Sequence, residues 1–87
     1  MAHFGYILQS QSTGAYYVGQ TNSLQERIAS HNKGEVQSTR PGRPWKLVYS
    51  KEFAARSQAV SWERMVKSRK KRKSIEELIH SERSAAR

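Results

Sequence analysis

The chain has 87 residues, and its 16 lysine and arginine residues outnumber its seven acidic residues, so its formal net charge is +9. A chain of this length forms one domain with a small core, because such a domain buries only about 60–65% of the surface that its unfolded form exposes. The positive charge favours a polyanionic partner, nucleic acid before a membrane surface, since neutralised phosphates release counterions.

The residue types that are absent exclude several kinds of site. The chain has no Cys, which excludes a disulfide framework, a zinc knuckle and a thiol nucleophile. It has no Asp, which excludes Asp-based calcium loops, Asp-centred two-metal nuclease sites and a Ser-His-Asp triad. No apolar run approaches the roughly 18 residues of a spanning helix, and the first residues lack the pattern of a signal peptide. We therefore expect a cytoplasmic protein without a membrane partner.

The first part of the chain predicts a β-hairpin followed by a helix. β-Rich runs at about residues 4–9 and 15–19 flank the polar segment QSQSTG. A helix follows within SLQERIASHN, where apolar residues recur at a spacing of four. Asn22 or Thr21 is expected to cap its start, and Gly34 suits its end.

The remainder predicts a loop, a strand and two helices. The Pro and Gly residues of KGEVQSTRPGRP favour a loop. Alternation in WKLVYSKEF predicts a third strand with Trp45, Leu47 and Tyr49 on one face. A helix is expected from Ser57, and the capping box Ser74–Glu77 is expected to start the last helix.

The order β-β-α-β-α-α predicts an α/β (α+β) domain, in which helices pack on a three-stranded antiparallel sheet. We expect this domain to span residues 1–80, and residues 81–87 to fray.

Five polar side chains could act together in this fold: Tyr6, Tyr17, Arg27, His31 and Glu63. Each alone has an ordinary structural interpretation: a sheet or core tyrosine, a solvated arginine, an exposed or capping histidine, or a glutamate paired with Lys67. Together they fit phosphodiester cleavage. A guanidinium can hold phosphate oxygens, an imidazole or phenol can move a proton, and one carboxylate can hold Mg²⁺. A free tyrosine has a pKa of about 10, so a tyrosine base needs help from nearby cations.

The chain resembles the GIY-YIG nuclease family, in particular its small single-domain bacterial members, over residues 4–80. The segments that carry the resemblance are FGYIL, YVG, NSLQERIASHN, STRPGRPWKLVYSKEF and RSQAVSWERMVKS. No single segment is specific, but the ordered series Tyr, Tyr-x-Gly, Arg, His, Glu at these spacings is. FGY stands where Gly-Ile-Tyr gives the family its name, and the functional tyrosine is retained.

The resemblance implies a function and a role for each of the five residues. Tyr6, Tyr17, Arg27 and His31 would be catalytic, and Glu63 would be catalytic and the ligand of one Mg²⁺ or Mn²⁺ ion. The reaction would be single-metal hydrolysis of a nucleic-acid phosphodiester that leaves 5′-phosphate and 3′-hydroxyl ends. We therefore expect a metal-dependent endonuclease that acts on DNA in repair, recombination or restriction-type processing.

A basic run, RMVKSRKKRK at residues 64–73, is expected to follow a phosphate backbone, or alternatively to be a solvated junction that keeps the protein soluble. Trp62 is expected to pack in the core rather than to stack on a base. The nucleic-acid-binding residues that we expect are Lys67, Arg69, Lys70, Lys71, Arg72, Lys73, Arg40 and Arg43, with Lys46 extending the same face.

Two other functions stay open. The chain could be a non-catalytic nucleic-acid-binding module or accessory subunit with a nuclease-like fold, which its charge and small size favour. It could also be a protein-interaction subunit that positions a larger enzyme. Larger family members attach a DNA-binding domain for which this chain has no room, so targeting would come from the domain itself, its basic tail or a protein partner.

Overall fold

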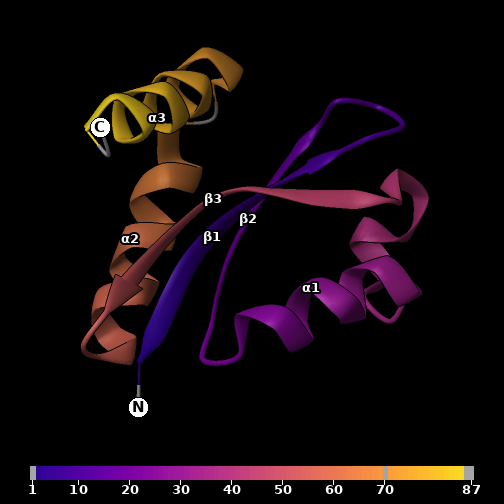
Figure 1. Ribbon diagram of the computed structural model, residues 1–87, viewed down its shortest axis with the longest axis horizontal. Coiled ribbons are helices and arrows are strands. Elements are labelled where there is room, and N and C mark those ends of the chain that lie inside the picture. The colour runs from indigo at the N-terminus through magenta and orange to yellow at the C-terminus, as the bar shows by residue number, and fades with distance from the viewer. Residues whose placement is uncertain (1, 70, 86–87) are drawn as a thin grey trace.

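The computed structural model, which describes residues 2–69 and 71–85, has the expected order β-β-α-β-α-α (Figure 1). Three antiparallel strands form one sheet in the order β2-β1-β3. The strands are β1 (His3–Ser10), β2 (Tyr16–Thr21) and β3 (Trp45–Phe53). The helices are α1 (Leu24–Lys33), the short 3-10 helix η1 (Gln37–Gly42), α2 (Arg56–Arg69) and α3 (Arg72–Ala85).

The sheet separates two small apolar clusters, because successive side chains of a strand point to opposite faces. On one face, Tyr6 and Leu8 of β1 pack with Trp45 and with residues of α1. On the other face, Ile7 packs with residues of α2 and α3, among them Trp62. Figure 1 shows the same division, with α1 on one side of the sheet and α2 and α3 on the other. None of the helices in the described part of the chain is long and apolar enough to cross a membrane.

A β-bulge in β3 changes which side chains share a face. Ile7 pairs with Tyr49, but Leu8 pairs with Leu47, so Val48 is the extra residue. Beyond the bulge the alternation is inverted, and Tyr49 joins the cluster of α2 and α3. The expectation that Tyr49 shares a face with Trp45 and Leu47 is therefore wrong.

Trp62 lies in the core as expected, with only 7% of its surface exposed. Its ring stacks on Tyr49, with the centroids 5.8 Å apart and the planes within 8°. Gly5 makes room for this ring, since a Cβ on Gly5 would lie 2.3 Å from Trp62 Cε3. The glycine in β1 thus marks a close approach between strand and helix, rather than the bulge.

The start of α1 differs from the expected one. Ser23, rather than Asn22 or Thr21, precedes the helix, and no side chain caps it. The Thr21 hydroxyl instead accepts a hydrogen bond from the Ser23 amide at 3.1 Å and so closes the turn from β2. Gly34 ends α1 as expected, with a φ of 83° that suits glycine.

The later boundaries also shift. Residues 37–42 form η1 inside the expected loop, and α2 starts at Arg56 rather than Ser57. Because α3 starts at Arg72, Ser74 lies inside its first turn and the expected capping box is absent. The same helix continues through residues 81–85, which we expected to fray, while residues 86–87 lie outside the described part of the chain.

Candidate active site

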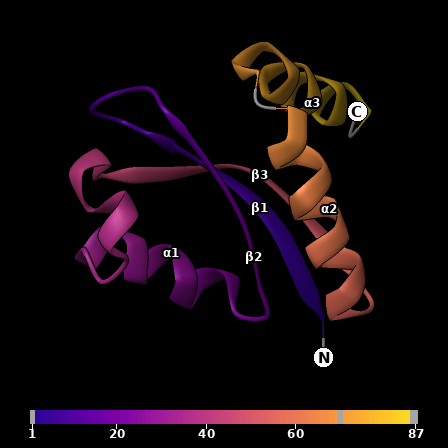
Figure 2. The same cartoon turned by 180° about the vertical axis from the view of Figure 1, so that it is seen from behind.

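The candidate site lies along β2, which is an edge strand with α1 on one side and α2 on the other (Figure 2). An edge strand has no neighbour beyond it, so side chains of the two helices can meet around it. This position explains how residues from both faces of the sheet reach one place.

Tyr6, His31 and Thr39 form a buried chain of hydrogen bonds. Tyr6 Oη lies 3.0 Å from His31 Nε2, and His31 Nδ1 lies 2.8 Å from Thr39 Oγ1. Thr39 Oγ1 in turn donates to the Val36 carbonyl oxygen at 3.2 Å. At most 1% of the surface of Tyr6, His31 or Thr39 is exposed. The chain therefore connects β1, α1 and η1 away from solvent.

The direction of each proton in this chain follows from its last member. Thr39 has one hydroxyl proton and gives it to Val36, so it must accept at its oxygen from His31 Nδ1–H. The neutral ring then has a lone pair on Nε2, and Tyr6 donates its phenol proton to that nitrogen. Thr39 thereby sets the tautomer of His31.

Burial keeps both ring groups neutral near pH 7. It lowers the pKa of His31 below its ordinary value of 6.5, and the positive charge of Arg27 lowers it further. Burial also raises the pKa of Tyr6 above 10.0, although the hydrogen bond from Arg27 acts in the opposite direction. If Tyr6 acts as a base, it must therefore pass its own proton to His31 through their hydrogen bond, because it is not a phenolate beforehand.

Gly19 of β2 lets the Tyr6 phenol reach its position. It pairs with Tyr6 in the sheet, and a Cβ on it would lie 2.5 Å from Tyr6 Oη. Any side chain here would push the phenol away from His31. The glycine of the Tyr-x-Gly motif thus has a steric role in the site.

Tyr17 covers the outer side of the buried chain. Its ring meets His31 edge to face, with centroids 4.8 Å apart, and lies 6.4 Å from the ring of Tyr6. Lys67 Nζ, from the helix on the other side of the sheet, lies 5.9 Å from the centroid of the Tyr17 ring. Tyr17 therefore links the α1 side of the site to the α2 side.

Arg27 supplies an exposed cation at the mouth of the site. Its guanidinium is a hydrogen-bond partner of Tyr6 and Tyr17, and it also lines a polar cavity at the end of β2. A guanidinium in this place can hold phosphate oxygens in a bidentate fork next to the tyrosines.

Glu63 is the carboxylate of the site. Its Oε2 lies 2.9 Å from Lys67 Nζ, and 21% of its side chain is exposed. Its negative charge contributes to the raised pKa of Tyr6, after burial and the charge of Tyr17. The same ammonium group of Lys67 lies 5.9 Å from the centroid of the Tyr17 ring, so it lies near both the carboxylate and the phenol ring.

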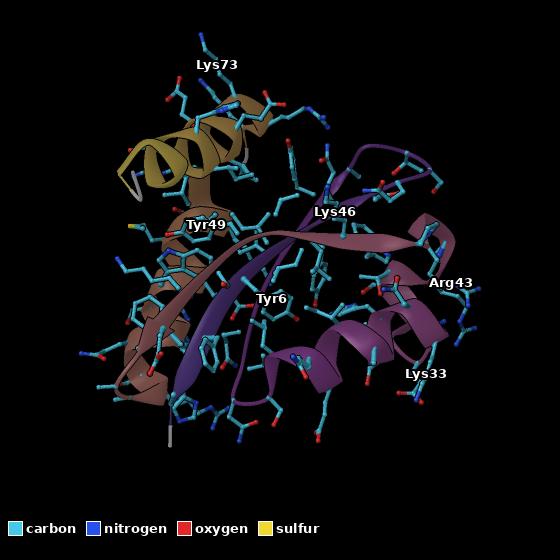
Figure 3. The ribbon with its side chains drawn as sticks, viewed as in Figure 1. Tyr6, Lys33, Arg43, Lys46, Tyr49 and Lys73 are labelled. Atoms are coloured by element: carbon cyan, nitrogen blue, oxygen red, sulfur yellow. The ribbon has the colours of Figure 1, made fainter. Side chains whose placement is uncertain are left out.

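The residues that we expected to bind nucleic acid come from several elements of the fold. In the view of Figure 3, Arg43 and Lys33 lie near the end of α1, Lys73 lies on α3, and Lys46 of β3 lies between Arg43 and Lys73. The Nε atoms of Arg40 and Arg43 donate to backbone carbonyls near the end of α1. Arg69, Lys71 and Lys73 are exposed, whereas Lys70 lies outside the described residues.

Arg72 has a structural role that its place in the basic run did not indicate. It donates to the Gly14 carbonyl at 2.7 Å, pairs with Glu76 at 3.3 Å and lies 4.7 Å from the ring of Tyr16. These contacts join α3 to the tip of the hairpin.

Two residues near the site were not among the expected site residues. Thr39 lies in the segment expected to be a loop, and nothing in the sequence pairs it with a histidine eight residues earlier. Arg56 shares the polar cavity with Arg27, although the two are far apart along the chain. Only the fold reveals these two positions.

Comparison with known proteins assigns the chain to a family. Residues 2–76 match the GIY-YIG catalytic domain. The chain is 40% identical over 75 residues to a UPF0213 protein of Streptococcus pneumoniae serotype 4, which covers 85% of this chain and 74% of that protein. It is 38% identical over 80 residues to a UPF0213 protein of Bacillus pumilus, which covers 87% of this chain and 81% of that one.

A solved structure shows the same fold. The solution NMR structure of a UPF0213 protein from Bacillus halodurans matches with a TM-score of 0.58 and 33% sequence identity, over 92% of this chain and 84% of that chain. The chain therefore belongs to the GIY-YIG nuclease family and is one of its small UPF0213-type proteins.

Proposed function

We propose that this protein is a metal-dependent endonuclease that hydrolyses phosphodiester bonds of DNA. The observation that carries this proposal is the buried chain from Tyr6 through His31 to Thr39, next to Arg27 and Glu63. Those groups supply a route for a proton, a phosphate ligand and a carboxylate within one site.

In the proposed reaction, Tyr6 accepts a proton from the attacking water as it gives its own proton to His31. The phenol needs no prior ionisation, because one proton leaves its oxygen while another arrives. The imidazolium that forms keeps its Nδ1–H bond to Thr39. Its charge is unfavourable beside Arg27, so once the product leaves the proton passes back through Tyr6 to solvent, while the leaving 3′ oxygen takes a proton from water.

Arg27 would hold the reacting phosphate through two oxygens and offset the charge that develops on it in the transition state. Its hydrogen bonds with Tyr6 and Tyr17 keep the guanidinium on the side where the water attacks. Loss of one such donor costs about 10²–10³ in rate in other enzymes.

Glu63 would hold the metal ion. Within the described residues there is no group of three or more His, Asp or Glu side chains that could hold a metal. Mg²⁺ does not need one, since it is usually bound through one or two carboxylates and keeps several waters. The ion pair of Glu63 with Lys67, whose Nζ also lies near the Tyr17 ring, supports a cation position between the carboxylate and Tyr17. A bound ion would polarise the phosphate and stabilise the leaving oxygen.

The buried chain also argues against a module that only binds nucleic acid. Binding relies on exposed cations that reach phosphates. Tyr6 and His31 are almost wholly buried and bond each other, so they do not act as exposed cations of this kind. A proton route explains why the polar groups lie inside rather than on the surface.

The test is cleavage of branched, nicked and single-stranded DNA with Mg²⁺ or Mn²⁺. We expect nicking that requires the metal and that falls at least 100-fold in Glu63→Gln and Arg27→Ala. Glu77→Gln, which removes an exposed carboxylate on α3, is the matched control and should cleave at the wild-type rate. Cleavage that survives both site substitutions would reveal a contaminating nuclease and defeat the proposal. Salt-dependent binding without cleavage of any substrate would favour the binding module.

A further inference from the structure

A polar cavity of about 380 Å³ opens at the end of β2. Of the five residues expected to be catalytic only Arg27 lines it, and the other lining residues lie outside that set. It is lined by His3, Gln20, Thr21, Asn22, Arg27 and Arg56. Figure 2 shows why these meet: the start of β1, the turn from β2 to α1 and the start of α2 come together there. Because Gln20 and Thr21 point to opposite faces of an edge strand, the cavity continues around the strand from one face to the other.

Two guanidinium groups and no carboxylate line this cavity. Among the side chains that the structure describes, ion pairs join Glu63 to Lys67 and Glu76 to Arg72, and neither Arg27 nor Arg56 takes part in one. Glu26, beside Arg27 in α1, lines a neighbouring hollow instead. The cavity therefore presents unpaired positive charge together with amide and hydroxyl groups, which is the chemistry of an anion site.

We propose that this cavity binds the phosphate adjacent to the reacting phosphate on the same nucleic-acid strand, with Arg56 as its principal ligand. The proposal rests on the proposed function for the identity of the reacting phosphate, and it extends the substrate contacts to a second phosphate. Gln20 and Asn22 can donate hydrogen bonds to phosphate oxygens from their side-chain amides. Because contacts to phosphate carry no sequence information, the site would bind a strand of any base sequence.

The position of Arg27 supports adjacency of the two phosphates. Arg27 contacts Tyr6 and Tyr17 and also forms a wall of the cavity, so a phosphate at the tyrosines and an anion in the cavity share one guanidinium. Successive phosphates of one strand are separated by a single nucleotide, and a guanidinium has five N–H donors, so one arginine can contact two neighbouring phosphates.

The lining also indicates which part of the strand enters. No aromatic ring other than the imidazole of His3 lines the cavity, so it offers no tyrosine or tryptophan platform on which bases stack. Its volume lies within the range of about 300–1,000 Å³ that is usual for small-ligand sites, and a phosphate with its sugar would fit. The backbone, rather than a base, is the fitting occupant.

The experiment compares two short oligonucleotides that differ by one phosphate. The thymidine dinucleotide TpT has one internal phosphate, and the trinucleotide TpTpT has two. Each is titrated by NMR into the wild type, Arg56→Gln and Lys33→Gln at low salt, with a chelator and no divalent ion. Lys33→Gln is the matched control, because it removes one positive charge at the far end of α1 (Figure 3).

In the wild type, the affinity for TpTpT should exceed that for TpT by about two- to fivefold, the range of one exposed charge pair, beyond the roughly twofold statistical advantage of a second phosphate. Arg56→Gln should remove this excess and leave only the statistical advantage, whereas Lys33→Gln should keep the wild-type ratio. The amides of Gln20, Thr21 and Asn22 should shift with TpTpT more than with TpT. An unchanged ratio in Arg56→Gln would overturn the proposal.

This experiment needs no cleavage, so its failure can be told from failure of the proposed function. If Arg56 responds to the second phosphate but the protein never cleaves DNA with Mg²⁺ or Mn²⁺, the nuclease proposal fails and the second phosphate site stands. If the protein cleaves DNA but Arg56→Gln keeps the wild-type ratio, the second phosphate site fails and the nuclease proposal stands.

Discussion

Thr39 Oγ1 lies 2.8 Å from His31 Nδ1, and this contact decides which nitrogen of the ring faces Tyr6. The threonine comes from η1, a short 3-10 helix in a segment rich in Pro and Gly. A second contact holds this segment, since Trp45 Nε1 donates to the Thr39 carbonyl at 2.7 Å. The hydroxyl is therefore fixed relative to both the helix α1 and the sheet.

Replacing Thr39 should change the tautomer of His31. Thr39→Val keeps the shape of the side chain but leaves His31 Nδ1–H buried without an acceptor, which should lower the free energy of unfolding by about 1–3 kcal/mol. Nitrogen-15 NMR of the imidazole should show Nδ1–H in the wild type and a changed tautomer mixture in Thr39→Val. Thr39→Ser keeps the hydroxyl and should restore the wild-type spectrum. A valine variant with the wild-type spectrum and stability would contradict this assignment.

His31 should make the protein less stable in acid. Its pKa is lowered in the folded state, so the unfolded chain binds more protons below the ordinary value of 6.5. The stability that neutral His31 contributes is complete above that pH and is lost as the pH falls toward the lowered folded-state pKa. Urea unfolding between pH 5 and pH 8, about the range in which an ordinary histidine titrates, should show this loss.

His31→Gln is the control for that pH dependence, because glutamine does not titrate. It should weaken the decline of stability below pH 6.5, the ordinary value for this group, although it lowers stability at every pH. An equal slope in wild type and variant would assign the acid sensitivity to another group.

Gly19 and Gly5 allow the effect of a methyl group in the candidate site to be compared with the effect of one in the core. Gly19→Ala adds a methyl group that would meet the Tyr6 phenol, and Gly5→Ala adds one that would meet the ring of Trp62. Each should cost about 1–3 kcal/mol of stability through overpacking. Only Gly19→Ala should also move the His31 imidazole signals and slow cleavage beyond what the unfolded fraction explains. Equal effects of the two variants on His31 would contradict a specific role for Gly19.

Arg72 and Lys73 should separate structure from nucleic-acid binding, although they are neighbours in the basic run. Arg72→Gln should loosen α3, because it removes the bond to Gly14 and the pair with Glu76, and the loss should be about 1 kcal/mol. Lys73→Gln should keep the stability and, if the basic run binds a phosphate, lower the salt dependence of DNA binding by about one unit of slope. Thermal unfolding measures the stability and salt titrations measure the DNA binding. Loss of stability in Lys73→Gln but not in Arg72→Gln would contradict these assignments.

The sequence predicted the elements well and their details less well. Local patterns suffice for β1, β2, α1 and β3, because alternation and helical spacing act over a few residues. The bulge at Val48 depends on the pairing of β1 with β3, which no local pattern contains, so the face of Tyr49 was assigned wrongly. The start of α3 was misplaced for a similar reason, since contacts of Arg72 with the hairpin favour an earlier start than the expected cap.

The candidate site shows the same limit. Tyr6, Tyr17, Arg27, His31 and Glu63 are expected together from an ordered motif. The structure brings the rings of Tyr6, Tyr17 and His31 into contact, and Glu63 pairs with Lys67, whose Nζ lies near the Tyr17 ring. Thr39 and Arg56 belong to no motif of that kind, and they reach the site only because η1 folds back on α1 and α2 starts beside β2. Residues that act through tertiary contacts need the fold to be recognised.

The central claim is that Tyr6 passes the proton of the attacking water to His31. Single-turnover cleavage of the best DNA substrate by Tyr6→Phe and Tyr16→Phe tests it most directly, because each removes one phenol hydroxyl. The Tyr16 hydroxyl bonds Glu76 on α3 and is the matched control. We predict that Tyr6→Phe lowers the rate about 10²–10⁴-fold and that Tyr16→Phe keeps it. Cleavage by folded Tyr6→Phe at the wild-type rate would contradict the claim.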